Sequence, residues 1–256
     1  MSVLLELTAA LRAGTVRVVD LTAPLSEQTP ILVLPPEFGQ TQRFELEEIS
    51  NYDSRGPAWY WNNFHTGEHT GTHFDAPNHW VTGRDGADIS AVPAERLIAP
   101  AAVLDFSDRV AADPDFLIQV DDVKEWEAQH GALPAGGWIL VRTGWDARKT
   151  QQEAINADES GPHSPGMSAE CARWIAQDTP VIGMGVETVG TDAGAAHSFE
   201  PNFPCHSYLM GSGKYGLTQL QNLASLPPTG AMVIAGPLPI VGGSGSPTRV
   251  LALVED

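Results

Sequence analysis

The sequence predicts a mixed α/β or α+β fold in a single domain that spans residues 1–256. Short apolar runs typical of buried strands alternate with helical segments, and no internal repeat or low-complexity linker separates them. With 256 residues, of which 42% are hydrophobic, the chain has enough apolar side chains for one substantial core. Most of the 20 prolines and 25 glycines fall between these segments, which indicates many ordered loops.

The expected strands are short apolar runs bounded by turn-forming residues. In chain order they cover residues 16–21, 102–106, 138–142, 181–185, 231–235 and 249–254. The expected helices have apolar residues at helical spacing and cover residues 3–12, 120–130, 168–177 and 217–223. Ser168 is the expected N-cap of the third helix, and Gly131 is the expected stop of the second.

The charge balance argues against two classes of function. The chain has 32 acidic and 14 basic residues, for a formal net charge of −18. Such a surface repels phosphate backbones and anionic lipid headgroups, so binding to nucleic acid or to a membrane is not expected. The first residues contain Glu6 within an apolar stretch and no basic start, which favours an amphipathic helix over a signal peptide. No segment approaches the length of a membrane span.

The cysteine content indicates a reducing compartment. Cys171 and Cys205 have no CxxC spacing and allow at most one disulfide. Two reduced thiols in a cytoplasmic protein are the simpler expectation.

The most informative segment is GEHTGTHFDAPNH at residues 67–79. It places His69, His73, Asp75 and His79 within eleven residues. Imidazole and carboxylate groups are the ligands that a catalytic divalent metal with an open coordination position requires. The segment therefore predicts a metal-dependent hydrolase.

The spacing within this segment constrains its local structure. In a regular strand, His69 and His73 would lie roughly 13 Å apart at about 3.3 Å per residue, too far to share one ion. A bend or short helical turn is expected instead, interrupted at Gly71 and Pro77. From such a turn, Asp75 needs an irregular exit to point towards the ion.

His79 has two possible roles in such a site, either as another ligand or as an acid/base beside the metal. Hydrolytic sites usually keep three protein ligands and leave a position for water. The acid/base role is therefore favoured.

The run at 69–79 resembles the HxGTHxDxPxH signature of the cyclase-like metallohydrolases, the family that holds bacterial kynurenine formamidases and isatin hydrolases. Weaker similarities at 20–22, 29–30, 185–192 and 245–249 extend the match over nearly the whole chain. The resemblance implies a swivelling β/β/α fold with a mixed barrel-like β core and peripheral helices, assembled as a homodimer or higher homo-oligomer. It also implies that His69, His73 and Asp75 hold the metal and that His79 is the acid/base.

The chain departs from the formamidase pattern further along. Formamidases carry a histidine and, twelve residues later, a glutamate that together hold a second metal; here these positions are His206 and Thr218. Because threonine is a poor replacement for a bridging carboxylate, we expect one divalent ion, with Mn²⁺ as the first candidate and Zn²⁺ or Fe²⁺ as alternatives. His206 is then free to bind substrate, and Gln219 is a further candidate polar contact.

Loss of this carboxylate favours the isatin hydrolase branch of the family, which several further segments also resemble. Trp59 and Trp61 alternate, so they would share one face of a strand and, with Phe38 or Trp80, could sandwich a flat aromatic ring. Packing in the core is the alternative for these aromatic residues. The expected reaction is hydrolysis of a cyclic amide, isatin to isatinate, by metal-activated water with His79 as general acid/base.

Three alternatives remain open. N-formylkynurenine or another cyclic amide can be the substrate of the same hydrolytic site. A non-haem iron oxygenase also uses two histidines and one carboxylate, and His73-x-Asp75 fits that triad, although here His69 supplies the third ligand locally and not from a distant strand. The third is a metal-binding protein without catalysis, against which an intact His79 argues.

Four polar residues outside the motif carry weaker expectations. His163 and His197 lie in loop-like segments, where a solvated or hydrogen-bonded histidine is common. Asp192 is expected to fix a loop near the site. Arg249 is expected to anchor a carboxylate or backbone carbonyls, because guanidinium does not titrate usefully.

Overall fold

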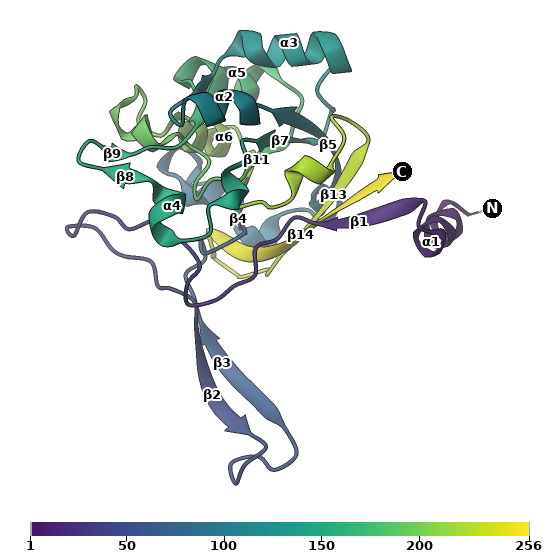
Figure 1. Ribbon diagram of the computed structural model, residues 1–256, viewed down its shortest axis with the longest axis vertical. Helices are drawn as coiled ribbons and strands as arrows, with labels where there is room; N and C mark the ends of the chain where they lie inside the picture. Colours follow the sequence, from purple (N-terminus) through teal and green to yellow (C-terminus); the bar gives the residue numbers. More distant parts are fainter. Residues whose placement is uncertain (1, 256) are drawn as a thin grey trace.

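The structure of the chain, a computed structural model, describes residues 2–255 and has a closed β-barrel at its centre (Figure 1). Seven strands form the ring, and the last pairs with the first. In ring order they are β14 (Gly245–Glu255), β13 (Ala231–Pro237), β5 (Ile98–Asp105), β7 (Trp138–Arg142), β11 (Gly183–Val186), β12 (Tyr215–Thr218) and β4 (His73–Asp75). The β5–β7–β11–β12 pairs are parallel, and the other pairs are antiparallel.

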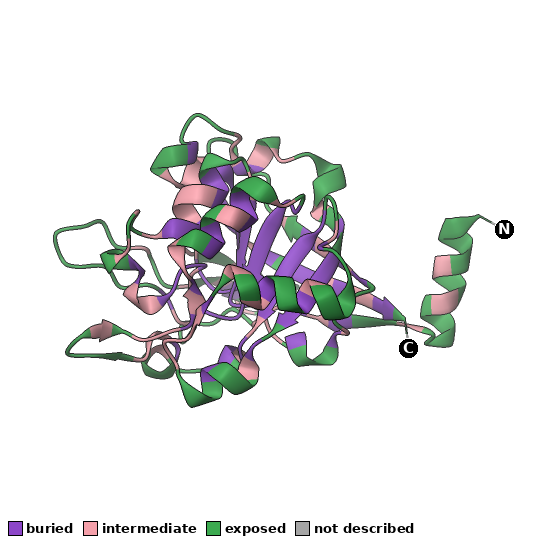
Figure 2. Ribbon diagram, turned by 90° about the horizontal axis from the view of Figure 1, so that it is seen from above, coloured by how far each residue is buried: buried purple, intermediate pink, exposed green. Residues whose placement is uncertain are grey.

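The long strand β14 closes the barrel and also extends beyond it. Residues 245–247 pair with β4, and residues 251–255 pair with β1 (Val16–Asp20), which lies outside the ring. Before β1, helix α1 (Val3–Ala13) stands away from the body and buries none of its residues (Figure 2). Within residues 2–255, no helix is both long enough and apolar enough to cross a membrane.

Alternating residues of the strands feed two separate apolar cores. One core fills the barrel and includes Phe74, Trp138 and Leu140. The other, which includes Ile139 and Met184, lies between the parallel strands and the helices on one side of the barrel (Figure 1). These helices are α2 (Ser107–Ala112), α3 (Val120–His130), α5 (Ala169–Asp178) and α6 (Pro204–Gly211). The mixed barrel core with peripheral helices that the resemblance implies is confirmed.

Three of the four expected helices are confirmed, as α1, α3 and α5. The Ser168 side chain caps α5 by accepting a hydrogen bond from the Cys171 amide, and Gly131 ends α3. The helix expected at 217–223 is wrong, because this segment ends the buried strand β12 and then turns at Gln219, which has a φ of 51°. A short apolar run does not distinguish a buried strand from a buried helix. The short helices α2, α4 (Gln151–Ile155) and α6 were not expected.

All six expected strands are confirmed as β1, β5, β7, β11, β13 and β14, although β5 and β14 begin earlier than expected. The sequence did not predict β4 or β12. It also missed two short ladders, in which β6 (Leu117–Ile118) pairs with β10 (Gly166–Met167) and β8 (Ala157–Asp158) pairs with β9 (Gly161–Pro162).

A β-hairpin projects from the body (Figure 1); a strand through Trp59 and Trp61 was expected, but the hairpin was not. It consists of β2 (Glu45–Asn51) and β3 (Tyr60–His65), and we call residues 45–65 the hairpin arm. Leu46 and Phe64 face each other across its ladder, and both are exposed. A two-stranded hairpin without a packed face is marginally stable in water.

Candidate metal centre

Strand β4 turns its side chains alternately into and out of the barrel. Phe74 points inwards, where its ring lies 5.8 Å from that of Trp138 and 5.1 Å from that of Tyr215. His73 and Asp75 therefore both point outwards. The irregular exit expected for Asp75 is wrong, because the two-residue period of a strand puts both side chains on one face.

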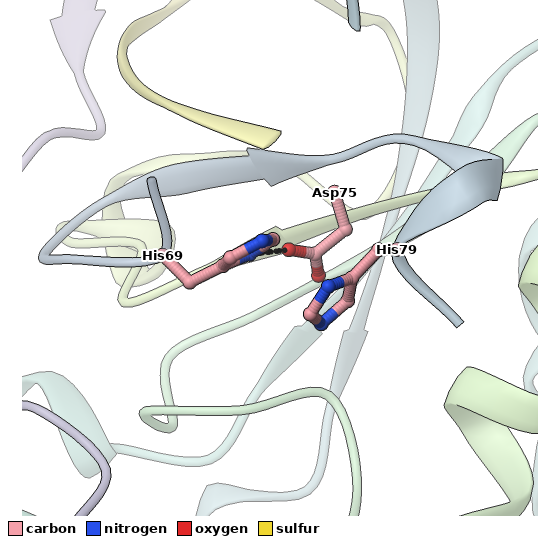
Figure 3. Close-up of side chains that lie close together, drawn as sticks. All are labelled: His69, Asp75 and His79. Carbon is pink, nitrogen blue, oxygen red and sulfur yellow. Dashed lines mark hydrogen bonds and ion pairs between the residues drawn. The ribbon is translucent and has the colours of Figure 1, made fainter. Parts of the chain in front are cut away.

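His69 lies in a bend that precedes β4, as expected from the spacing. Gly71 has a φ of 66° in this bend, a conformation that favours glycine. The bend returns His69 to the outward face of β4, where its Nδ1 lies 2.8 Å from Asp75 Oδ1 (Figure 3).

His79 reaches the same place from the other end of the motif. Pro77 begins a single 3₁₀ turn, Pro77–His79, directly after β4. This turn stacks the His79 ring on that of His69 at 3.8 Å. Ligand-type atoms of His69, Asp75 and His79 all lie within 4.8 Å of one another (Figure 3).

His73 completes the group from β4 itself. Its Nδ1 lies 2.7 Å from the Gly71 carbonyl oxygen, to which it donates, so its Nε2 carries a free lone pair. That Nε2 lies 3.3 Å from Asp75 Oδ1. The structure thus brings together all four residues of the motif, while the division into three ligands and one acid/base stays a prediction.

The electrostatics of this cluster suit a cation. Asp75 is 1% exposed, and among residues 2–255 its Oδ2 has no hydrogen-bond partner. Burial raises the pKa of Asp75, but His73 and His69 outweigh burial and hold this pKa well below its usual range. An ionised, buried carboxylate with a free oxygen among imidazole nitrogens is a donor set that fits a divalent metal.

Burial also controls the charge of His79. It lowers the pKa of His79 to about 3, against the opposing effect of Asp75. The ring is therefore neutral at neutral pH, the form that accepts a proton.

His206 extends the cluster from the first turn of α6. Its ring lies 5.4 Å from that of His79 and 4.7 Å from that of Trp80. Asp192 Oδ2 accepts a 2.5 Å hydrogen bond from His206 Nδ1. Burial lowers the pKa of His206, but this bond outweighs burial and raises it overall. Asp192 Oδ1 also accepts from the Cys205 amide, so the residue expected to fix a loop holds the start of α6.

The two neighbours Thr218 and Gln219 point to different places. Thr218 pairs with His73 across the β12–β4 ladder, and its Oγ1 lies 2.8 Å from His73 Nδ1. A hydroxyl therefore stands at the position where the formamidase pattern has a carboxylate. The Gln219 side chain is buried and donates to the Pro30 carbonyl.

Trp59, Trp61 and Phe38 do not pack in the core of the chain. Trp59 and Trp61 belong to the hairpin arm and are 48% and 54% exposed, and Phe38 is 59% exposed. Trp80, by contrast, is half-buried beside His79, with ring centroids 6.0 Å apart. Core packing, the alternative for these aromatic side chains, is therefore wrong for the first three.

A large cavity opens at the base of the hairpin arm, with a volume of about 920 Å³. Phe44, Phe64 and Leu238 line it, and Glu68 and Thr72 from the metal motif contribute polar groups. Glu68 also hydrogen-bonds Ser244, which contacts His69, so it lies between the cavity and the cluster. Sequence reasoning missed both Glu68 and Ser244; the only signal was the glycine-rich run that ends at Pro247.

Comparisons with known proteins agree with this arrangement. A family model described as putative cyclase matches residues 19–193. An isatin hydrolase of Roseibium aggregatum is 49% identical over 257 residues, which cover 99% of this chain and 97% of the relative. A crystal structure of an isatin hydrolase bound to the product analogue thioisatinate has a TM-score of 0.97 and 47% identity, with 100% of both chains covered. A predicted metal-dependent hydrolase from Bacillus stearothermophilus has a TM-score of 0.67 and 25% identity, with 93% of this chain and 98% of that chain covered.

Proposed function

Because the chain belongs to the putative cyclase family, we propose that it is a metal-dependent hydrolase that opens the lactam ring of isatin to give isatinate. One observation carries the proposal. His69, His73, Asp75 and His79 converge on the outer face of β4, in a chain that is 49% identical to an isatin hydrolase over nearly its whole length. One domain spanning residues 1–256 carries out the reaction.

His69, His73 and Asp75 would hold one divalent ion. The buried, unpartnered Oδ2 of Asp75 and the two imidazoles support this assignment. The Thr218 hydroxyl, in place of a carboxylate, supports one ion over two. Mn²⁺ is the first candidate, with Zn²⁺ and Fe²⁺ as alternatives. When bound, the ion lowers the pKa of a water molecule towards neutrality and polarises the substrate carbonyl.

His79 moves the proton. As a neutral ring, it takes a proton from the attacking water, whose oxygen bonds to the amide carbonyl carbon. The carbon–nitrogen bond of the ring then breaks, and the leaving nitrogen takes the proton from His79. Water and isatin thus give an amine and a carboxylic acid, which releases its proton to solvent to give the carboxylate, and His79 returns to its neutral form.

His206 and Trp80 would bind the substrate beside His79. Asp192 holds the Nδ1 of His206 and so leaves Nε2 for a ligand. The raised pKa of His206 favours the protonated ring, which can donate a hydrogen bond to the keto oxygen of the substrate or to the carboxylate of the product. The Trp80 ring, tilted by 33° from that of His206, offers a flat apolar surface to an aromatic substrate. Gln219 would contribute indirectly, by holding the Pro30 loop.

The enzyme acts as a homodimer in which the hairpin arm packs on a second copy. The apolar side chains of the arm, which are exposed in the single chain, support this assembly. In the dimer, Trp59, Trp61 and Phe38 would complete an aromatic binding surface at the interface. A cytoplasmic location is supported by Cys171 and Cys205, which are both buried and unpaired.

The test is an absorbance assay of isatin ring opening by the metal-loaded protein. We expect isatinate to form in the presence of metal and activity to be lost after chelation. Parallel assays with N-formylkynurenine and an acyclic aryl amide define the substrate class, and an oxygen electrode tests for an oxygenase. No isatin hydrolysis with Mn²⁺, Zn²⁺ or Fe²⁺ would reject the proposal.

A further inference from the structure

The loop that enters β14 meets the metal motif through Ser244. Ser244 Oγ lies 2.8 Å from His69 Nε2, although 175 positions separate the two residues. The same hydroxyl lies 2.6 Å from Glu68 Oε2, which also accepts a 3.0 Å hydrogen bond from the Ser244 amide. Glu68, Ser244 and His69 therefore form a continuous chain of hydrogen bonds that ends at the candidate metal ligand.

The direction of these bonds follows from the groups themselves. A carboxylate only accepts hydrogen bonds, so the Ser244 hydroxyl donates its single proton to Glu68. Its oxygen lone pair then accepts from His69, which must carry its proton on Nε2. The other ring nitrogen, Nδ1, lies 2.8 Å from Asp75 Oδ1. Without a metal it donates to this carboxylate, and when a metal is bound its lone pair is left for the ion.

We propose that Glu68 and Ser244 are positioning residues that fix the tautomer and ring orientation of His69, so that Nδ1 is available to the metal. The inference rests on the proposed metal site, and its test does not use the hydrolytic reaction. His73 obtains the equivalent constraint from a backbone group, the carbonyl of Gly71. His69 obtains it from two side chains, and mutation can remove these.

Two glycines make this approach possible. A Cβ atom at Gly245 would lie 2.6 Å from His69 Cε1, and one at Gly243 would lie 2.9 Å from Glu68 Oε1. Any larger residue at Gly245 would displace His69, and any larger residue at Gly243 would displace Glu68, from this series of hydrogen bonds. The GGSGSP run at residues 242–247, which we call the cradle, therefore lets the backbone approach His69 closely on both sides of the Ser244 side chain.

The cradle is held in register with the motif on both sides of Ser244. The Ala76 amide donates a 2.9 Å hydrogen bond to the Ser244 carbonyl, and Gly245 pairs with Asp75 in the β14–β4 ladder. Barrel closure thus sets the distance between Ser244 and His69. Partners that hold the other ring nitrogen of a metal-binding histidine typically account for a factor of about 10 to 100 in metal affinity.

The test compares Mn²⁺ affinity in the wild-type protein, Ser244→Ala and Glu68→Gln, measured by competition with a chelator of known affinity. Ser244→Ala removes the acceptor for His69 Nε2, and Glu68→Gln adds an amide donor that can turn the serine proton towards His69. We expect Mn²⁺ binding to weaken about 10- to 100-fold in both variants, with little change in the melting temperature of the metal-free protein.

Two variants serve as matched controls, because they alter similar groups away from the cluster. Ser107→Ala removes a hydroxyl that donates to Asp105, and Glu47→Gln neutralises an exposed carboxylate of the hairpin arm. Both are expected to bind Mn²⁺ as the wild type does. Wild-type affinity in both Ser244→Ala and Glu68→Gln would overturn the proposal.

A second measurement reads the tautomer directly. In the ¹⁵N spectrum of the Zn²⁺-loaded wild-type protein, we expect His69 to carry its proton on Nε2, and in Ser244→Ala this proton loses its acceptor and exchanges faster with solvent. A Zn²⁺-loaded wild-type His69 with its proton on Nδ1 would refute the proposal. If isatin is not hydrolysed but the affinity and tautomer results hold, the proposed function fails and the positioning role stands.

Discussion

The imidazole rings of His69 and His79 stack with centroids 3.8 Å apart and an interplanar angle of 27°. They come from opposite ends of the metal motif, and the bend before β4 and the turn after it fold both onto one face of the strand. The stack places a neutral, half-buried imidazole directly beside the candidate ligands. This arrangement is the basis of the first prediction.

Replacing His79 by alanine should leave the metal bound and lower turnover by about 10²- to 10⁴-fold, because the proton acceptor is lost. Turnover on isatin and metal content per chain are measured together. His130→Ala, which removes an exposed histidine of α3, is the matched control. Unchanged turnover would exclude the acid/base role, and loss of the metal would instead make His79 a ligand.

Replacing Asp192 by asparagine should raise KM more than it lowers kcat. The carboxylate raises the pKa of His206 and orients its Nδ1, whereas an amide keeps a hydrogen-bond acceptor for the Cys205 amide but carries no charge. We expect KM to rise about tenfold, equivalent to about 1.4 kcal/mol of binding energy. Asp115→Asn is the control. A tenfold fall in kcat with KM unchanged would contradict the binding role of His206.

Chelation should abolish turnover, and readdition of Mn²⁺ should restore it. Elemental analysis of the reconstituted protein should give about one ion per chain, since Thr218 offers a hydroxyl where a second ion needs a carboxylate. Two ions per chain would show that another residue replaces the missing glutamate.

Replacing Phe74 by alanine should destabilise the metal-free protein by about 3–5 kcal/mol, because a fully buried ring between Trp138 and Tyr215 is lost. Urea unfolding measures this free energy. Phe38→Ala, at an exposed position, should leave it nearly unchanged. A small effect at Phe74 would mean that the barrel interior collapses around the missing ring.

The contribution of His163 to stability should depend on pH. Its hydrogen bonds to Asp115 and Asp158 raise its pKa above 6.5 in the folded chain. Because the folded pKa is the higher one, this contribution is fully present below pH 6.5 and is lost as the pH rises through the folded pKa. The unfolding free energies of wild type and His163→Gln should therefore differ most at acidic pH. An NMR titration of His163 locates the folded pKa, and a difference that grows with pH would contradict the assignment.

The barrel strands with long apolar runs were predictable, because burial on both faces leaves a continuous hydrophobic pattern. Strand β4 was not predictable, because its residues His73 and Asp75 are polar and interrupt the apolar pattern of a buried strand. The hairpin arm also escaped prediction, since the glutamates of β2 obscure any alternation of a half-buried strand. The sequence pattern at 217–223 suggested a helix where β12 ends, because an apolar run this short fits either structure.

The sequence by itself determined the chemistry of the cluster, because His69, His73, Asp75 and His79 are close along the chain and need only a bend, a strand and a turn to converge. It also predicted His206 as a substrate contact through family resemblance. Only the tertiary structure decided which groups hold these residues in place. Ser244 reaches His69 because β14 closes the barrel on β4, and such a contact depends on the register of strands far apart in the sequence.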